Sequence, residues 1–183
     1  MKKQLILALV CLLLSSLAVG CGSAEATKAE LKTFTPEGKN FTVAFPGEPT
    51  VDSFTVESPY GQQLTDTYML EGKTSMQAFT TTVMPEEVLA DDLDTVLTNS
   101  ANGALGNING GEGEITDITI LDTPAKSFKC TIATPEGPTL IIEGHIVIIE
   151  GTLYQMQYMA DEKNWDKFKD ERDGFFNSFV INK

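Results

Sequence analysis

Residues 139–160 read TLIIEGHIVIIEGTLYQMQYMA, and this stretch decides the fold. Two runs rich in β-branched and aromatic residues flank Glu150-Gly151, a pair typical of a hairpin turn. With this pair at the centre of the turn, the cross-strand partners on one face are Ile149 and Thr152, Val147 and Tyr154, His145 and Met156, and Glu143 and Tyr158. The other face carries Ile142, Gly144, Ile146 and Ile148 against Leu153, Gln155, Gln157 and Met159. Because apolar residues occupy both faces, we predict that the hairpin lies in the middle of a sheet covered on two sides.

Shorter alternating runs predict further strands before the hairpin. The run Phe41-Thr42-Val43-Ala44-Phe45 alternates cleanly and is followed by a turn at 46–49. Further strands are expected near 51–57, 63–70, 74–83, 115–121 and 125–133. Proline and glycine mark the turns between them, at Pro59-Tyr60-Gly61, Glu71-Gly72-Lys73 and Pro135-Glu136-Gly137-Pro138.

Two helices are expected among these strands. One begins at Pro85, a favoured residue for a first turn, and its apolar side is Leu89, Leu93, Val96, Leu97, Ser100 and Ala104. The other runs from about Glu162 to Asn177, with Trp165, Phe168, Arg172, Phe175, Phe176 and Phe179 at roughly helical spacing. Strands and helices in this order predict an α+β fold, in which an antiparallel sheet of about six to eight strands is flanked by two main helices.

Two polar stretches invite a ligand-binding interpretation. Asp91, Asp92 and Asp94 are acidic neighbours, but the Asx-rich loop and terminal glutamate of an EF-hand are absent, so a solvated helix face fits better. Residues 107–113 (NINGGEG) are glycine-rich, yet the sequence after them is typical of a strand and not of the helix that follows a phosphate loop. We interpret this loop as a mobile connector, with a ligand lid as the alternative.

The composition indicates one ordinary domain plus a leader. The chain has 183 residues, of which 42% are hydrophobic and 21% charged. From Cys21 onward it keeps all 26 acidic residues but only 11 of the 13 basic ones, because Lys2 and Lys3 lie in the leader, so its formal charge is −15. Such a charge repels phosphate backbones and anionic headgroups, so nucleic-acid binding is disfavoured and membrane attachment should be covalent.

The first twenty residues, MKKQLILALVCLLLSSLAVG, have the features of a secretory signal: two lysines, an apolar core and small residues before a cleavage point. The alternative is a permanent membrane anchor, but the apolar run from Leu5 to Leu14 is short for a span of about 20 residues. Residues 21–32 are small and polar, so we expect a tether there and a single domain over 33–183.

Ala18-Val19-Gly20-Cys21 resembles the bacterial lipobox. The resemblance implies cleavage between Gly20 and Cys21, a diacylglyceryl thioether on Cys21, and acylation, commonly by palmitate, of the new amino terminus. More than one acyl chain anchors a protein stably in a membrane, whereas a single chain binds only marginally. The expected address is therefore the extracytoplasmic side of the cell membrane or the outer membrane. Cys11 lies in the leader, so Cys130 has no partner for an internal disulfide, and alternation places it with Phe128 on a buried face.

Three motifs together resemble the bacterial PsbP/Mog1-like proteins: FTVAFPGEPTV at 41–51, GTLYQM at 151–156 and FFNSF at 175–179. The resemblance covers most of the chain from Phe34 onward and rests on a strand with its turn, a hairpin and a helix end. It implies a PsbP/Mog1-like fold and a non-catalytic adaptor or accessory subunit of an envelope or membrane complex. These motifs match structural positions, so no functional residue is carried over.

Residues able to support catalysis are few. His145 is the only histidine, and Glu143 shares its strand face, so the pair forms the one candidate for acid–base or metal chemistry. A metal site would want more ligands, and neither a second histidine nor a cysteine pair is present. No nucleophile-elbow motif occurs either. We expect a hydrogen-bonded structural pair, and we expect no catalytic residue, no metal and no cofactor.

Tyr154, Met156 and Tyr158 beside His145 and Glu143 form a weak candidate binding surface. Aromatic, methionine and polar mixtures suit a partner or small ligand where the face is only partly covered. The alternative is that these side chains are core. The sequence therefore favours a lipid-anchored, extracytoplasmic, non-catalytic module for an envelope protein or small ligand. The competing classes are a hydrolase or metal-dependent enzyme using His145 and Glu143, and a structural spacer of the envelope.

Overall fold

The computed structural model describes residues 30–58, 61–108, 112–135 and 137–182. The expected signal peptide, with Gly20, Cys21 and most of the tether, lies outside these ranges, as do the centre of the glycine-rich loop and parts of two turns. The strands are β1 (Lys32–Phe34), β2 (Phe41–Phe45), β3 (Thr50–Ser58), β4 (Gly61–Glu71), β5 (Ser75–Val83), β6 (Gly113–Ile120), β7 (Thr123–Ile132), β8 (Leu140–Ile149), β9 (Thr152–Asp161) and β10 (Val180–Ile181). The helices are α2 (Glu86–Leu89), α3 (Leu93–Asn107), the 3₁₀ turn η1 (Glu162–Asn164) and α4 (Lys169–Asn177).

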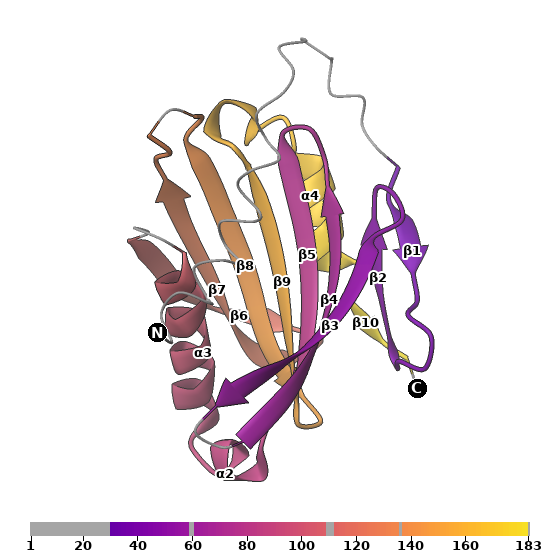
Figure 1. Ribbon diagram of the computed structural model, residues 1–183, viewed down its shortest axis with the longest axis vertical. Helices are drawn as coiled ribbons and strands as arrows, with labels where there is room; N and C mark the ends of the chain where they lie inside the picture. Colours follow the sequence, from indigo (N-terminus) through magenta and orange to yellow (C-terminus); the bar gives the residue numbers. More distant parts are fainter. Residues whose placement is uncertain (1–29, 59–60, 109–111, 136, 183) are drawn as a thin grey trace.

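These elements form the expected α+β fold. A seven-stranded antiparallel sheet has the order β3-β4-β5-β9-β8-β7-β6, and a small sheet has the order β1-β2-β10. Helix α3 lies on one face of the large sheet, and α4 lies on the other together with the small sheet (Figure 1). The predicted fold class, an antiparallel sheet of about six to eight strands with two main helices, is confirmed.

The central hairpin has the predicted register. β8 and β9 lie in the middle of the large sheet, and they pair His145 with Met156 and Glu143 with Tyr158. Glu150 and Gly151 have φ angles of 49° and 75°. A two-residue hairpin turn with positive φ at both positions matches the right-handed twist of its strands, which is why this pair connects them.

The face under α3 is aliphatic and tightly packed. Val96, Leu97, Ala101 and Leu105 of α3 are buried against β7 and β8. Phe128 is fully buried, and its ring lies over Gly144, where an added Cβ would come within 2.2 Å of a ring atom. Cys130 is buried beside it, as its alternation predicted, and burial raises the pKa of its thiol.

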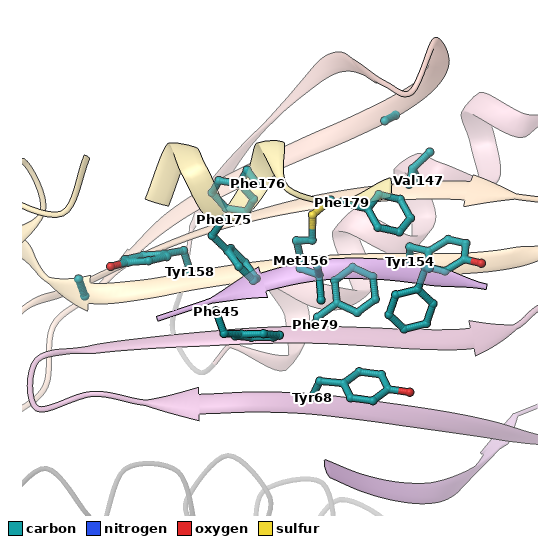
Figure 2. Packing of buried hydrophobic residues seen from close by; sticks show 14 of the residues in the cluster. Phe45, Tyr68, Phe79, Val147, Tyr154, Met156, Tyr158, Phe175, Phe176 and Phe179 are labelled. Atoms are coloured by element: carbon teal, nitrogen blue, oxygen red, sulfur yellow. The ribbon is translucent and has the colours of Figure 1, made fainter. Parts of the chain in front are cut away.

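The opposite face is aromatic. Phe175 and Phe179, from α4 and the segment after it, pack against rings from the sheet and from β2 (Figure 2). The centroid of Phe175 lies 5.4 Å from that of Phe45, and the centroid of Phe179 lies 4.9 Å from that of Tyr154. Aromatic pairs at such separations add to the free energy gained from burying their area, so this layer fixes α4 and the small sheet on the large one.

The helix predicted from Pro85 was wrong as a single element. α2 ends at Leu89, and α3 begins at Leu93 after a break at Ala90–Asp92. Asp92 is the N-cap of α3, because its side chain accepts a hydrogen bond from the Thr95 backbone N–H at 3.1 Å. Aspartate favours such caps over helix interiors, so the acidic run interrupts the helix and Leu89 and Leu93 are left exposed.

The C-terminal helix predicted over 162–177 was also wrong in extent. Residues 162–164 form η1, a turn follows, and α4 begins only at Lys169. The aromatic residues of this segment nevertheless lie in the core, since Trp165 and Phe175 are both buried. The short strands β1 and β10 were not predicted, because runs of three and two residues show no alternation that distinguishes a strand.

Candidate functional site

The predicted pair His145 and Glu143 lies under α4. The Nε2 atom of His145 is 3.4 Å from Oε1 of Glu143, and 18% and 22% of the two side chains are exposed. The His145 ring stacks on Phe176 of α4, with centroids 3.9 Å apart and planes 20° from parallel. The imidazole therefore contacts Phe176 of α4 and Glu143 of its own strand, β8.

Arg172 of α4 completes this group. Its Nε atom lies 3.5 Å from Oε2 of Glu143, and its Nη1 donates a hydrogen bond to the Trp165 carbonyl at 3.1 Å. The guanidinium also lies 4.1 Å from the centroid of the Trp165 ring, where a cation–π attraction is favourable. The hydrogen bond from His145 and the charges of Arg172 and Lys129 lower the pKa of Glu143, so this carboxyl group is ionised at neutral pH.

The other three residues of the predicted surface lie in the core. Met156 and Tyr158 have no exposed surface, and Tyr154 has 4%. The Tyr158 hydroxyl donates to Oε1 of Glu171 at 2.9 Å, and Nε2 of Gln77 donates to the same oxygen at 2.7 Å. Figure 2 shows Tyr154, Met156 and Tyr158 among the aromatic rings that fill this face. All three support α4 and the small sheet, and Met156 and Tyr158 present no surface to a ligand.

A second group of residues lies at the other end of the same sheet face. The strand register places residues of β3, β4, β5 and β9 in rows across the sheet, and two of these rows lie where the cover of β2 ends. Phe41 of β2 still packs against Tyr154 in the inner row, and the outer row lies beyond it. The inner row is Ser53, Asp66, Thr81 and Tyr154, in which neighbours pair directly. The outer row is Thr55, Leu64, Val83 and Thr152. Its apolar members are open to solvent, Leu64 being 55% and Val83 67% exposed.

The β4, β5 and β9 residues of these rows form the floor of a cleft of about 120 Å³, and the chain just before β2 forms its wall. The lining residues are Lys39, Asn40, Phe41, Leu64, Asp66, Thr81, Val83, Thr152 and Tyr154. The inner end is closed by Phe41, whose ring stacks on Phe79 at 4.9 Å. We call this feature the β4–β5 cleft.

Asp66 is the buried charge of the β4–β5 cleft. Its Oδ1 accepts a hydrogen bond from the Ser53 hydroxyl at 2.6 Å, and its Oδ2 forms an ion pair with the Lys39 ammonium. These two bonds lower the pKa of the Asp66 carboxyl group, although burial opposes the shift. Tyr154, at the far side, has a raised pKa because its hydroxyl is buried and the Glu150 carboxylate lies near it.

Apart from Tyr154, none of the residues that line this cleft was predicted from the sequence to belong to a binding site. Leu64 and Asp66 alternate in β4 as residues of any half-buried strand do, so their pattern does not distinguish an open row from a covered one. The exposed row depends on where β2 ends, and the ion pair joins residues 27 positions apart. A usable hint was that a charged residue, Asp66, shares a strand face with Leu64 and Tyr68.

The acidic residues near α3 have structural partners. Asp92 caps α3, and Asp94 forms an ion pair with Lys126 of β7. Lys126 also binds Asp117 of β6, so this lysine joins α3 to the edge of the sheet. Within the described ranges, no three histidine, cysteine, aspartate or glutamate side chains gather closely enough to hold a metal ion. Among the helices of the same ranges, none has the length and apolar character needed to span a bilayer.

Comparison with known proteins gives structural matches. No protein-family model matches the chain. No curated protein matches it either. The solution structure of cyanobacterial PsbP (CyanoP) from Synechocystis sp. PCC 6803 is similar to it with a TM-score of 0.56 at 12% identity, covering 90% of this chain and 98% of that one. The chain thus has the PsbP-like fold that its motifs predicted.

Two further solved structures are similar over most of their length. One is PA94 of Pseudomonas aeruginosa, a protein of unknown function, with a TM-score of 0.49 at 11% identity, covering 84% of this chain and 98% of that one. The other is LpqN of Mycobacterium tuberculosis, described as involved in cell envelope biogenesis, with a TM-score of 0.44 at 13% identity, covering 84% and 91%.

Proposed function

We propose that this chain is a lipid-anchored extracytoplasmic domain that binds an envelope protein or small ligand and catalyses no reaction. The observation that carries the proposal is the β4–β5 cleft. There, Leu64 and Val83 are more than half exposed beside the buried charge of Asp66. Neighbouring exposed apolar side chains around a few fixed polar groups are typical of a binding site.

The anchor is supported by the leader and by the charge of the mature chain. The lipobox at Ala18–Cys21 supplies the thiol for a lipid, and a charge of −15 gives an anionic membrane no electrostatic hold on the domain. The chain enters β1 at Lys32. Extended, residues 21–32 reach roughly 40 Å at most, so the tether lets the cleft face partners that lie away from the lipid surface.

The contacts of His145 and Glu143 favour a structural role for this pair over the alternative of a hydrolase or metal-dependent enzyme. Glu143 is shared between His145 and Arg172, and His145 is stacked on Phe176. Each ionisable group thus has a partner inside the fold. A general base needs instead a free approach to its substrate.

The anchor is tested by comparing the native protein with Cys21→Ser in membrane fractions and by intact mass. We expect the native protein to carry lipid and to sediment with membranes, and the variant to be unlipidated and soluble. A soluble, unlipidated native protein would remove the anchor from the proposal.

The cleft is tested by a photo-crosslinking amino acid at Asn40, which lines it, in cells that carry the native anchor. Asn102, exposed on α3, provides the control position on the opposite face. We expect a discrete adduct from position 40 and none from position 102. Equal labelling from both positions, or none from either, would contradict a binding role for the cleft.

A further inference from the structure

The two halves of the ion pair in the β4–β5 cleft differ in how firmly they are held. Asp66 is on a strand inside the sheet, and only 11% of its side chain is exposed. Lys39 comes from the turn before β2, and 38% of its side chain is exposed. Lys39 can therefore withdraw into water at little loss, whereas a carboxylate left in this position without a cation would be strongly unfavourable.

The surroundings favour a positive group beside Asp66. Glu150, at the β8–β9 turn, is close enough to raise the pKa of Tyr154, and Glu86 and Glu87 begin α2 at the same end of the sheet (Figure 1). The mature chain as a whole carries −15. An anion could accept hydrogen bonds from Thr81 and Thr152, but it would have to approach Asp66 against this field.

The size of the cleft limits what can enter it. About 120 Å³ is room for roughly four water-sized groups, whereas sites for whole small molecules are about 300–1,000 Å³. A ligand that binds here must therefore leave most of its mass outside. Leu64 and Val83 are exposed beside the cleft, so they could contact this outer part of a ligand whose alkyl chain reaches Asp66.

We propose that the β4–β5 cleft binds a lysine side chain of a partner protein, and that the Lys39 ammonium occupies the place of the partner's ammonium in the free domain. The partner's lysine pairs with Asp66, its methylene stem lies against Phe41 and Leu64, and apolar residues beside it cover Val83. Lys39 is then released to solvent. This inference rests on the proposed binding function and specifies the chemistry of the partner.

The test uses the full-length protein in detergent micelles and three peptides that share one frame. The probe is acetyl-Gly-Leu-Lys-Leu-Gly-amide, and its controls carry norleucine or glutamate in place of lysine. Binding is measured by calorimetry at low and at physiological salt. We expect the lysine peptide to bind at least tenfold more tightly than either control, and Lys39→Met to tighten it a further tenfold by removing the internal competitor.

Asp66→Asn is the matched loss variant, and we expect it to abolish the preference for lysine over norleucine. Should it fold poorly, the double variant Leu64→Thr with Val83→Thr reports on the same site, with an expected tenfold loss for all three peptides. n-Butylammonium serves as the free-amine probe. Because it lacks the outer contacts, we expect it to bind Lys39→Met at least a hundredfold more weakly than the peptide.

Three results would overturn the inference: equal binding of the lysine and norleucine peptides, stronger binding of the glutamate peptide, or no gain in Lys39→Met. Butylammonium binding as tight as the peptide would also overturn it, in favour of a free amine as ligand. If the peptides fail while crosslinking from Asn40 succeeds, only the lysine partner is lost. If both fail, the proposed function is lost with it.

Discussion

The two ends of the sheet face under α4 carry ionisable groups in opposite circumstances. At the covered end, Glu143 lies between His145 and Arg172 beneath the helix. At the open end, Asp66 is paired with Lys39, which reaches in from a turn, and the next row of the sheet is exposed. At the covered end, every charged group is paired with another residue beneath α4. At the open end, the buried carboxylate of Asp66 lies next to exposed residues and is paired with a partly exposed lysine.

This difference arises from how far the covering elements extend. β2 brings Phe41 over Phe79 and Tyr154, and this ring is the last cover that the small sheet gives. Beyond it the strands of the large sheet continue for one more row, which holds Leu64, Val83 and Thr152. The side chains of that row are exposed because β2 begins at Phe41 and not earlier.

The largest effect should come from removing Arg172 at the covered end. Arg172→Ala deletes the hydrogen bond to the Trp165 carbonyl, the cation over the Trp165 ring and one of the two partners of Glu143. We expect the free energy of unfolding to fall by about 2–4 kcal/mol. Chemical denaturation measures it, with Lys169→Ala as a control on the same helix, where the exposed ion pair with Asp173 should contribute little.

Next in size is Glu171→Ala, at the same end. This change removes the acceptor for the Tyr158 hydroxyl and the Gln77 amide, both of which are on fully buried side chains. Buried donors without acceptors destabilise, and we expect a loss of about 1–3 kcal/mol. Glu171→Gln keeps an acceptor oxygen and should retain most of the stability. Equal losses in the two variants would show that the hydrogen bonds are not the cause.

Much of this fold was predictable because its central hairpin is local. Glu150-Gly151 fixes the turn and alternation fixes the register, so the pairing of His145 with Met156 required no knowledge of the rest of the chain. The break before α3 was missed because an acidic run is equally typical of a solvated helix face and of a cap. β10 was missed because it pairs with β2, more than 130 residues earlier.

The candidate site was less predictable for a related reason. Polar residues within an apolar strand stand out in a sequence, so His145 and Glu143 were noticed, whereas Leu64 and Val83 look like ordinary core residues. Whether such residues are covered depends on long-range packing of β2, which no local pattern encodes. Tyr154 belongs both to the aromatic core and to the lining of the β4–β5 cleft.

A smaller effect should appear in the pH dependence at the open end. The fold lowers the pKa of Asp66 below its usual 3.8, so the ionised form stabilises the native state at neutral pH. This contribution is fully present above the unfolded pKa and is lost as pH falls through the folded one. We expect Asp66→Asn to be less stable than wild type at pH 6 and to match it more closely as pH falls below about 4. Thermal unfolding between pH 2.5 and 7 measures this, and a constant difference across that range would refute the assignment.

The smallest effect on stability should come from the exposed row itself, where the largest effect on binding is expected. Leu64→Thr with Val83→Thr keeps residues that favour strands and removes the apolar rim of the cleft. Because both side chains are more than half exposed, we expect each change to alter the free energy of unfolding by no more than about 0.5 kcal/mol.

The yield of crosslinking from Asn40 should nevertheless fall by more than half in this double variant. Val56→Thr, exposed on the opposite face of β3, is the matched control and should leave the yield unchanged. If the double variant unfolds, Leu64 and Val83 are needed for stability, as the residues of the covered end are. If it is stable and crosslinks normally, these two residues do not contribute to binding.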